Sequence, residues 1–138
     1  MENVDDERKL KEFTEAAAMQ RFEAGILFGE LTVYLAMFGG LLNAYYRTPP
    51  LSRIDQVLLS CVGLGLSLAF TVINSRGAKH LLAVIRRAEE LGRELGMPLY
   101  DYRPIGKTVF SGLNAVRFIY ILGIATWIIL ILRGMVLV

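Results

Sequence analysis

Polar side chains interrupt stretches of this sequence that are otherwise apolar enough to cross a lipid bilayer. They comprise one carboxylate, one guanidinium and three amides: Glu30, Arg117, Asn43, Asn74 and Asn114. An isolated ion inside a bilayer is energetically costly, and by default it marks a pairing site or a functional site. Glu30 is expected about 9 Å inside the first apolar stretch, with Arg117 at a similar depth along the third. These residues could therefore pair as ions, bond helices together or line a water-filled passage.

Three arrangements of Glu30 and Arg117 are compatible with these positions. In the first, they form an ion pair, within one chain or between subunits, with Asn74, Thr71 and Asn114 as polar neighbours. In the second, they belong to a polar ring around a water-filled pore or cavity. In the third, both side chains snorkel to the lipid headgroups. Asn43, near the other end of the first stretch, could bond across helices or line the same passage.

The sequence carries no motif for catalysis or cofactor binding that would compete with this interpretation. It lacks the GxxxxGK[ST] phosphate loop, the GxSxG nucleophile elbow and the HExxH zinc motif. Its single histidine, His80, and single cysteine, Cys61, cannot complete a metal site between them. The net charge of +2 is too small to predict nucleic-acid binding. We expect no enzyme activity, no metal and no cofactor.

The apolar stretches predict an integral membrane protein of the all-α class. Hydrophobic residues make up 54% of the chain and gather in three blocks. As helices these blocks would be roughly 25–33 Å long, against a hydrocarbon core of about 30 Å. We expect spans at residues 25–46, 54–74 and 109–132 of a single membrane domain over residues 1–138. A soluble helical bundle is the alternative, but its helices should show polar faces, and most of the third block shows none.

Two segments outside the spans predict helices that continue beyond the membrane. Residues 1–24 are rich in good helix formers and in charges, and residues 75–95 are amphipathic. We expect one helix at about 4–46 and a second at about 54–95, joined by a loop at the Pro49–Pro50 pair. A third helix is expected at about 104–137, because Pro104 can open it. The first two would form a long hairpin that projects into the cytoplasm.

The distribution of basic residues predicts the orientation of the chain. Most lysines and arginines lie before the first span or between the second and third spans, whereas the first loop holds only Arg47 and Arg53. By the positive-inside rule, the N-terminus and the second connection are cytoplasmic and the C-terminus is outside. We therefore expect a multi-pass protein of the inner (plasma) membrane.

The expected hairpin brings opposite charges to the same heights. If its two helices are antiparallel around the proline loop, residue i faces roughly residue 100 minus i. Three acid–base pairs follow from this register: Glu23 with Arg76, Glu12 with Arg87, and Asp6 with Arg93. Exposed pairs of this kind contribute little stability each, so they would select register and partner.

Small residues within the spans predict close approach between helices. They recur at spacings of four residues in the first span and again in the second. The positions expected in helix packing are Gly25, Gly29, Gly40, Gly63 and Ser67.

The segment from residue 75 to residue 104 carries an acidic-residue–Leu–Gly motif followed by a Leu–Tyr pair. The matching residues are Glu90, Leu91, Gly92, Leu99 and Tyr100. In this the chain resembles small bacterial integral membrane proteins of unknown function, in which a span leads into an amphipathic helix with both features. The resemblance implies three spans and a cytoplasmic amphipathic helix. It also implies a role in bacterial defence or stress, because such proteins are often encoded beside genes of that kind.

Two functional expectations follow. In the first, the chain is a small homo-oligomeric membrane protein that forms or gates a pore, because three spans enclose too little volume for a channel alone. In the second, the spans are an anchor and the cytoplasmic hairpin is an adaptor that binds a soluble protein partner. The expected partners are the lipid bilayer, other copies of the chain and, in the second case, that soluble protein.

Overall fold

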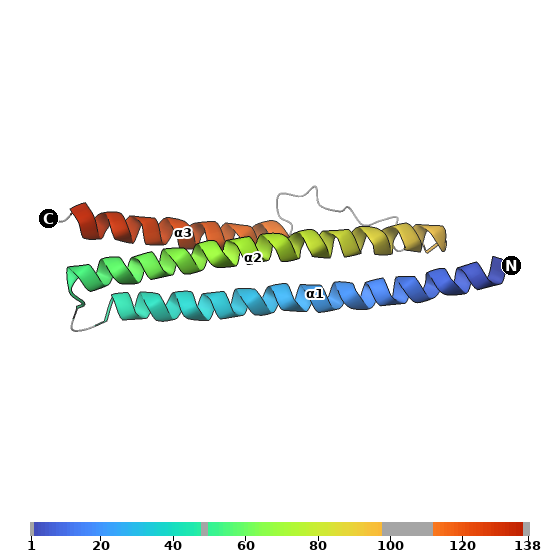
Figure 1. Ribbon diagram of the computed structural model, residues 1–138, viewed down its shortest axis with the longest axis horizontal. Coiled ribbons are helices and arrows are strands. Elements are labelled where there is room, and N and C mark those ends of the chain that lie inside the picture. Colours follow the sequence, from blue (N-terminus) through green and yellow to red (C-terminus); the bar gives the residue numbers. More distant parts are fainter. Residues whose placement is uncertain (1, 48–49, 98–111, 137–138) are drawn as a thin grey trace. The chain divides into compact units, whose positions relative to one another are not determined.

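The computed structural model of the chain describes residues 2–47, 50–97 and 112–136, and it is helical almost throughout that part. Helix α1 covers Glu2–Tyr45, α2 covers Arg53–Glu94 and α3 covers Gly112–Val136 (Figure 1). No strand occurs among the described residues, so the all-α class is confirmed. Each helix is long and apolar enough to cross a membrane by its length and composition.

The ends of the first two helices lie within two residues of their expected positions. Ser52 caps the start of α2: its Oγ accepts a hydrogen bond from the Asp55 backbone N–H at 3.2 Å and donates one to Asp55 Oδ2 at 2.6 Å. At the other end, Gly96 takes a φ of +68° and closes the helix in a Schellman turn. Its two hydrogen bonds run from Gly96 N–H to Arg93 O and from Met97 N–H to Gly92 O. The expected start of the third helix at Pro104, and of its span at residue 109, lies outside the described residues.

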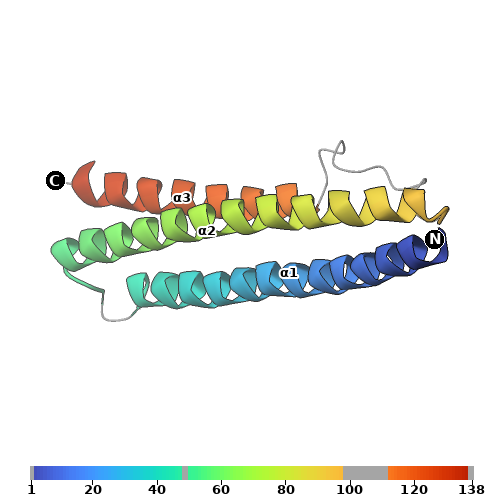
Figure 2. The same ribbon diagram turned by 45° about the vertical axis from the view of Figure 1, so that its right-hand side comes forward.

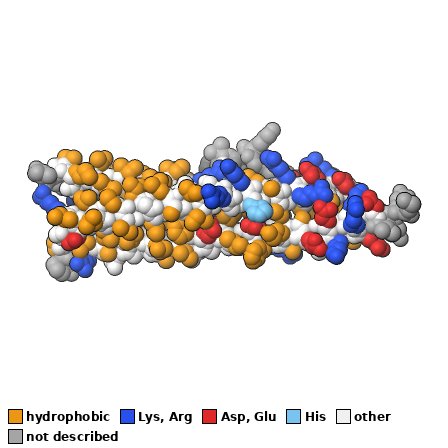
Figure 3. All heavy atoms as spheres, viewed as in Figure 1, with side chains coloured by type: hydrophobic (Ala, Val, Ile, Leu, Met, Phe, Trp, Pro, Cys, Tyr) orange, Lys and Arg blue, Asp and Glu red, His pale blue; other side chains and the backbone are white. Residues whose placement is uncertain are grey.

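The chain divides into two compact units, and α1 and α2 each run through both. We call Met1–Phe28 with Arg76–Ser111 the charged unit, and Gly29–Ser75 with Gly112–Val138 the apolar unit. The division lies within a few residues of the boundaries expected at 24/25 and 74/75. On the face shown in Figure 3, hydrophobic side chains cover the apolar unit and acidic and basic side chains gather over the charged unit.

In the apolar unit, α3 lies beside the first half of α2, and the second half of α1 completes a three-helix bundle (Figures 1 and 2). The buried residues of α3 alternate spacings of four and three: Val116, Tyr120, Gly123, Trp127 and Leu130. This is the seven-residue repeat with which long helices pack side by side. In the charged unit, ion pairs join the start of α1 to the end of α2, Leu27, Leu81 and Leu91 are buried, and Leu27 lies against Gly77.

Candidate functional site

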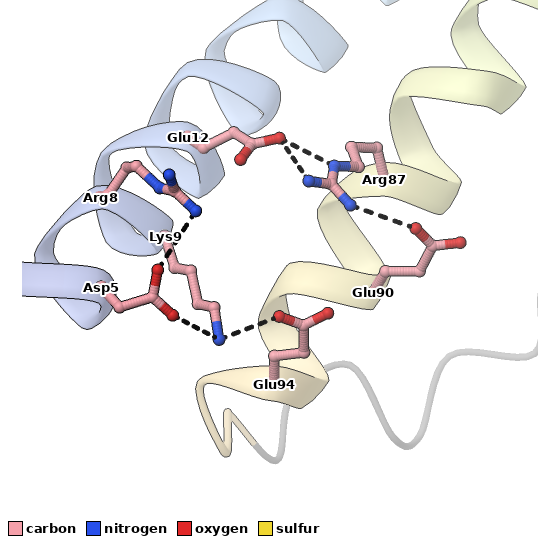
Figure 4. Close-up of polar contacts among 7 residues, drawn as sticks. All are labelled: Asp5, Arg8, Lys9, Glu12, Arg87, Glu90 and Glu94. Carbon is pink, nitrogen blue, oxygen red and sulfur yellow. Dashed lines mark hydrogen bonds and ion pairs between the residues drawn. The ribbon is translucent and has the colours of Figure 1, made fainter. Parts of the chain in front are cut away.

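The charged unit holds a network of ion pairs across its two helices (Figure 4). Arg87 donates from Nε and Nη2 to a single oxygen of Glu12, Oε1, at 2.8 and 2.7 Å. Its Nη1 also lies 3.6 Å from Glu90. Glu12 is the partner that the sequence predicts for Arg87. The network fixes the antiparallel register of this unit.

Lys9 makes the second link between the two helices. Its Nζ lies 3.3 Å from Asp5 on its own helix and 3.3 Å from Glu94 on α2. The Asp5 and Glu94 carboxylates raise the pKa of the Lys9 ammonium above its ordinary value of 10.5. Because the pKa of Lys9 is raised, the stability that its ion pairs contribute is present at neutral pH. It is lost only as the pH rises through the raised pKa of Lys9. The carboxylate of Glu12 likewise raises the pKa of Arg87.

The other two predicted pairs are not formed within the chain, and between subunits they stay predictions. Among the described residues, no ion pair joins Glu23 to Arg76 or Asp6 to Arg93. The register sets the height at which two residues meet, but the helical repeat sets the face from which each side chain leaves. Lys9 and Glu94 occupy facing positions near the height expected for Asp6 and Arg93.

A stripe of polar and small residues runs along the inner face of α2. Within the apolar unit, Ser60, Ser67 and Asn74 recur every seven residues, and each has 0–1% of its surface exposed. The Ser67 hydroxyl donates to Gly63 O at 2.9 Å, so it must accept the hydrogen bond from the Tyr34 hydroxyl at 3.1 Å. This link holds α1 to α2 at the centre of the unit.

Other buried polar atoms of the apolar unit have no hydrogen-bond partner among the described residues. They are Glu30 Oε2, Asn74 Nδ2 and Oδ1, the Tyr120 hydroxyl and Trp127 Nε1. Leaving such a group unpaired costs about 1–3 kcal/mol. In the charged unit, Glu89 also has a buried oxygen, Oε1, without a hydrogen-bond partner among the described residues, and 4% of its surface is exposed. The sequence pattern did not single out Glu89, because its neighbours in the helix are also charged.

The predicted Glu30–Arg117 ion pair is not formed within the chain. No ion pair between them occurs in the described part of the chain, Arg117 is exposed, and one carboxylate oxygen of Glu30 is buried. The helical repeat explains the difference: Val116 and Tyr120 face the bundle, so Arg117, about 100° further round α3, faces outward. A pair between subunits stays a prediction.

The five polar residues singled out from the sequence therefore separate into two groups. Glu30 and Asn74 place polar atoms in the interior of the apolar unit. Asn43, Asn114 and Arg117 are exposed on its outer surface.

The small residues also separate into an inner group and an outer group. A Cβ on Gly63 would overlap the indole ring of Trp127, so this glycine and Ser67 pack within the chain. Gly25, Gly29 and Gly40 have nothing within 4 Å of the position that a Cβ would take. These three face outward and leave room for another helix.

Aromatic residues that the sequence analysis passed over close the interior of the bundle. The Tyr34 ring lies 4.7 Å from Tyr120 and 5.5 Å from Phe70, and the Phe38 ring lies 5.5 Å from Trp127 between centroids. The sequence does not mark Tyr120 and Trp127 as buried, because almost every position around them in α3 is apolar. Tyr34 in α1 carries no such mark either.

A second feature lies where α1 ends, α2 begins and α3 ends. A cavity of 290 Å³ opens there, and three arginines line it together with two tyrosines and a glutamine.

No known protein family, characterised protein or solved structure matches this chain. The class of protein is indicated by the fold alone: its three candidate spanning helices suggest a multi-pass membrane protein.

Proposed function

We propose that copies of this chain assemble in a lipid bilayer into a pore whose path runs between subunits. The closed interior of the apolar unit supports a path of this kind. The rings of Tyr34, Phe38, Phe70, Tyr120 and Trp127 fill the space between its three helices, with neighbouring centroids 4.7–6.4 Å apart. A single chain thus offers no room for an aqueous passage, and any passage must be formed by its outer surfaces.

The exposed guanidinium of Arg117 is the observation that carries the proposal. It projects from the outer surface of an apolar helix, and it makes no ion pair in the described part of the chain. Facing lipid, an unpaired charge costs about 2.5–3.5 kcal/mol at the centre of a helix span, and less at a position such as Arg117, five residues after the start of α3. A water-filled lumen between copies removes that cost, and Asn43 and Asn114 are also on the outer surface.

The outer surface also provides for contact between copies. Gly29 and Gly40 on α1 and Gly65 on α2 have open space where a side chain would be. Glycines of this kind let helices approach closely in a membrane, where van der Waals packing and not hydrophobicity drives association.

Ion flux from liposomes that contain the purified protein tests the proposal. We expect flux from the wild-type assembly and a changed flux or ion selectivity in Arg117→Gln, because the lumen loses a ring of charge. Arg86→Gln is the matched control: Arg86 is also exposed, but it lies in the charged unit, and its removal should leave flux unchanged. An assembled oligomer without flux would rule the pore out.

An adaptor function is the second proposal, and the surface of the charged unit favours it. Leu10 and Phe22 are among the large apolar residues that this unit exposes, with 48% and 62% of their surfaces exposed. In this case the spans anchor the chain, and the charged unit binds a soluble protein on the cytoplasmic side. Deletion of residues 1–24 should then abolish recruitment of that protein and leave membrane insertion intact.

A further inference from the structure

Three arginines from separate elements surround the cavity at the loop end of the apolar unit. Arg47 follows α1, Arg53 begins α2 and Arg133 lies in the last turn of α3. The 290 Å³ cavity is lined by Tyr45, Tyr46, Arg47, Pro50, Arg53, Gln56, Arg133 and Gly134. No acidic residue is among these described residues, so the described part of the lining carries three positive charges.

These charges are not balanced by the rest of the described chain. None of the three arginines makes an ion pair with another described residue. Asp55, the acid closest to Arg53 in sequence, accepts one hydrogen bond from the Ser52 hydroxyl in the helix cap and makes no ion pair with a described residue. Like charges around one small cavity repel each other, and a bound anion removes that repulsion.

The donors at the cavity suit a phosphate group. Guanidinium groups offer planar pairs of N–H donors that match two phosphate oxygens, and they bind phosphate with more geometric specificity than an ammonium does. Helix α2 begins at Arg53, so the positive end of its dipole lies at the cavity and favours an anion further. The hydroxyl groups of Tyr45 and Tyr46 can add neutral donors.

The place of the cavity along the apolar helices indicates where the phosphate comes from. It lies where α1 ends, which is also where the apolar stretch of that helix ends, at the level where a bilayer would have its headgroups. The expected orientation makes this the outer side, where the positive-inside rule leads one to expect few arginines. Three of them nevertheless converge there, which calls for a local anionic partner.

We propose that the Arg47–Arg53–Arg133 cavity binds a phosphate group, presented by an anionic phospholipid headgroup or by free phosphate. The site lies within one chain and does not depend on the formation of a pore. Its consequence is that the loop end of the apolar unit is held to a defined headgroup or anion, with α1, α2 and α3 tied together through it.

Native mass spectrometry of the detergent-purified full chain tests the site with defined probes. The probes are phosphatidylglycerol, diacylglycerol as the comparison lipid without a phosphate group, and inorganic phosphate. We expect wild-type protein to retain phosphatidylglycerol, and Arg47→Gln with Arg133→Gln to lower its affinity by about tenfold or more, because hydrogen bonds to charged groups are lost. Arg86→Gln is the control, since it removes the same charge from the charged unit.

The outcomes distinguish a lipid headgroup from free phosphate as the bound group, and some of them would overturn the proposal. Retention of phosphatidylglycerol but not of inorganic phosphate identifies a headgroup site, and retention of both identifies a site for phosphate in general. Equal retention of the two lipids, or an equal loss in Arg86→Gln, would overturn the proposal. Arg133→Lys is a second variant, and an unchanged helical circular dichroism spectrum would show that it folds. It keeps the positive charge but not the planar N–H donors, so a specific phosphate site predicts weaker binding of phosphatidylglycerol to this variant too.

Discussion

Tyr34 and Trp127 show how single residues define the apolar unit, because each packs against a glycine on another helix. A Cβ on Gly123 would overlap the Tyr34 hydroxyl, and one on Gly63 would overlap the Trp127 indole. The two large side chains fill the bundle only because these glycines leave them room. The packing of Tyr34 and Trp127 therefore depends on the glycines that they contact.

The substitution Gly123→Ala tests this packing. The added methyl group must displace Tyr34 and weaken its hydrogen bond to Ser67, so we expect the free energy of unfolding to fall by about 1–3 kcal/mol. Unfolding titrations in detergent micelles measure the change. Gly39→Ala is the control, because nothing lies within 4 Å of its Cβ position and alanine favours the helix. Equal stability of both variants would show that Tyr34 is not packed against Gly123.

Residue-scale features were only partly predictable from the sequence. The sequence could place Glu30 and Arg117 at one depth, because depth follows from helix length. It could not tell which face each occupies, because almost every neighbour in these segments is apolar and the pattern marks no buried side. The structure places a carboxylate oxygen of Glu30 inside the bundle and Arg117 on its surface.

At the scale of elements, α2 combines two kinds of interior in one continuous helix. Its buried seven-residue series is Ser60, Ser67, Asn74, Leu81 and Ala88. The series is polar in the apolar unit and apolar in the charged unit, so this stripe of α2 differs in each unit from the surface around it. This helix could be predicted closely, because the proline loop and Gly96 mark its ends whichever face is buried.

A charge exchange tests the pairing of α1 and α2 in the charged unit. Glu12→Arg or Arg87→Glu alone places like charges opposite each other, so we expect each to destabilise the unit at low salt. The double variant restores opposite charges and should recover most of the loss. Thermal unfolding at low and high salt measures both effects, and the difference should shrink at high salt because the pair is exposed. A double variant no better than the singles would contradict direct pairing.

At the scale of the whole molecule, the exposed surface of the apolar unit is hydrophobic on all three helices. Val33, Val62 and Ile129 are examples, each with more than half of its surface exposed. A soluble protein does not expose so extended an apolar surface, because it would associate in water. This surface is therefore the part of the molecule that lipid or other copies of the chain would cover.

Labelling with a membrane-impermeant maleimide tests the proposed orientation. In a Cys61→Ser background, we expect Leu51→Cys to react in intact cells, because the first loop would face outward. Arg8→Cys should react only after permeabilisation, because the N-terminal segment would be cytoplasmic. The opposite pattern would reverse the orientation, and reaction of both in intact cells would contradict insertion across the membrane.

The number of chains in the assembled particle tests the central claim most directly, since the bundle interior is closed and a pore needs several outer surfaces. Native mass spectrometry of the protein extracted in nanodiscs counts these chains. The proposed pore predicts a single closed assembly of more than two copies. A monomer or a dimer would contradict it.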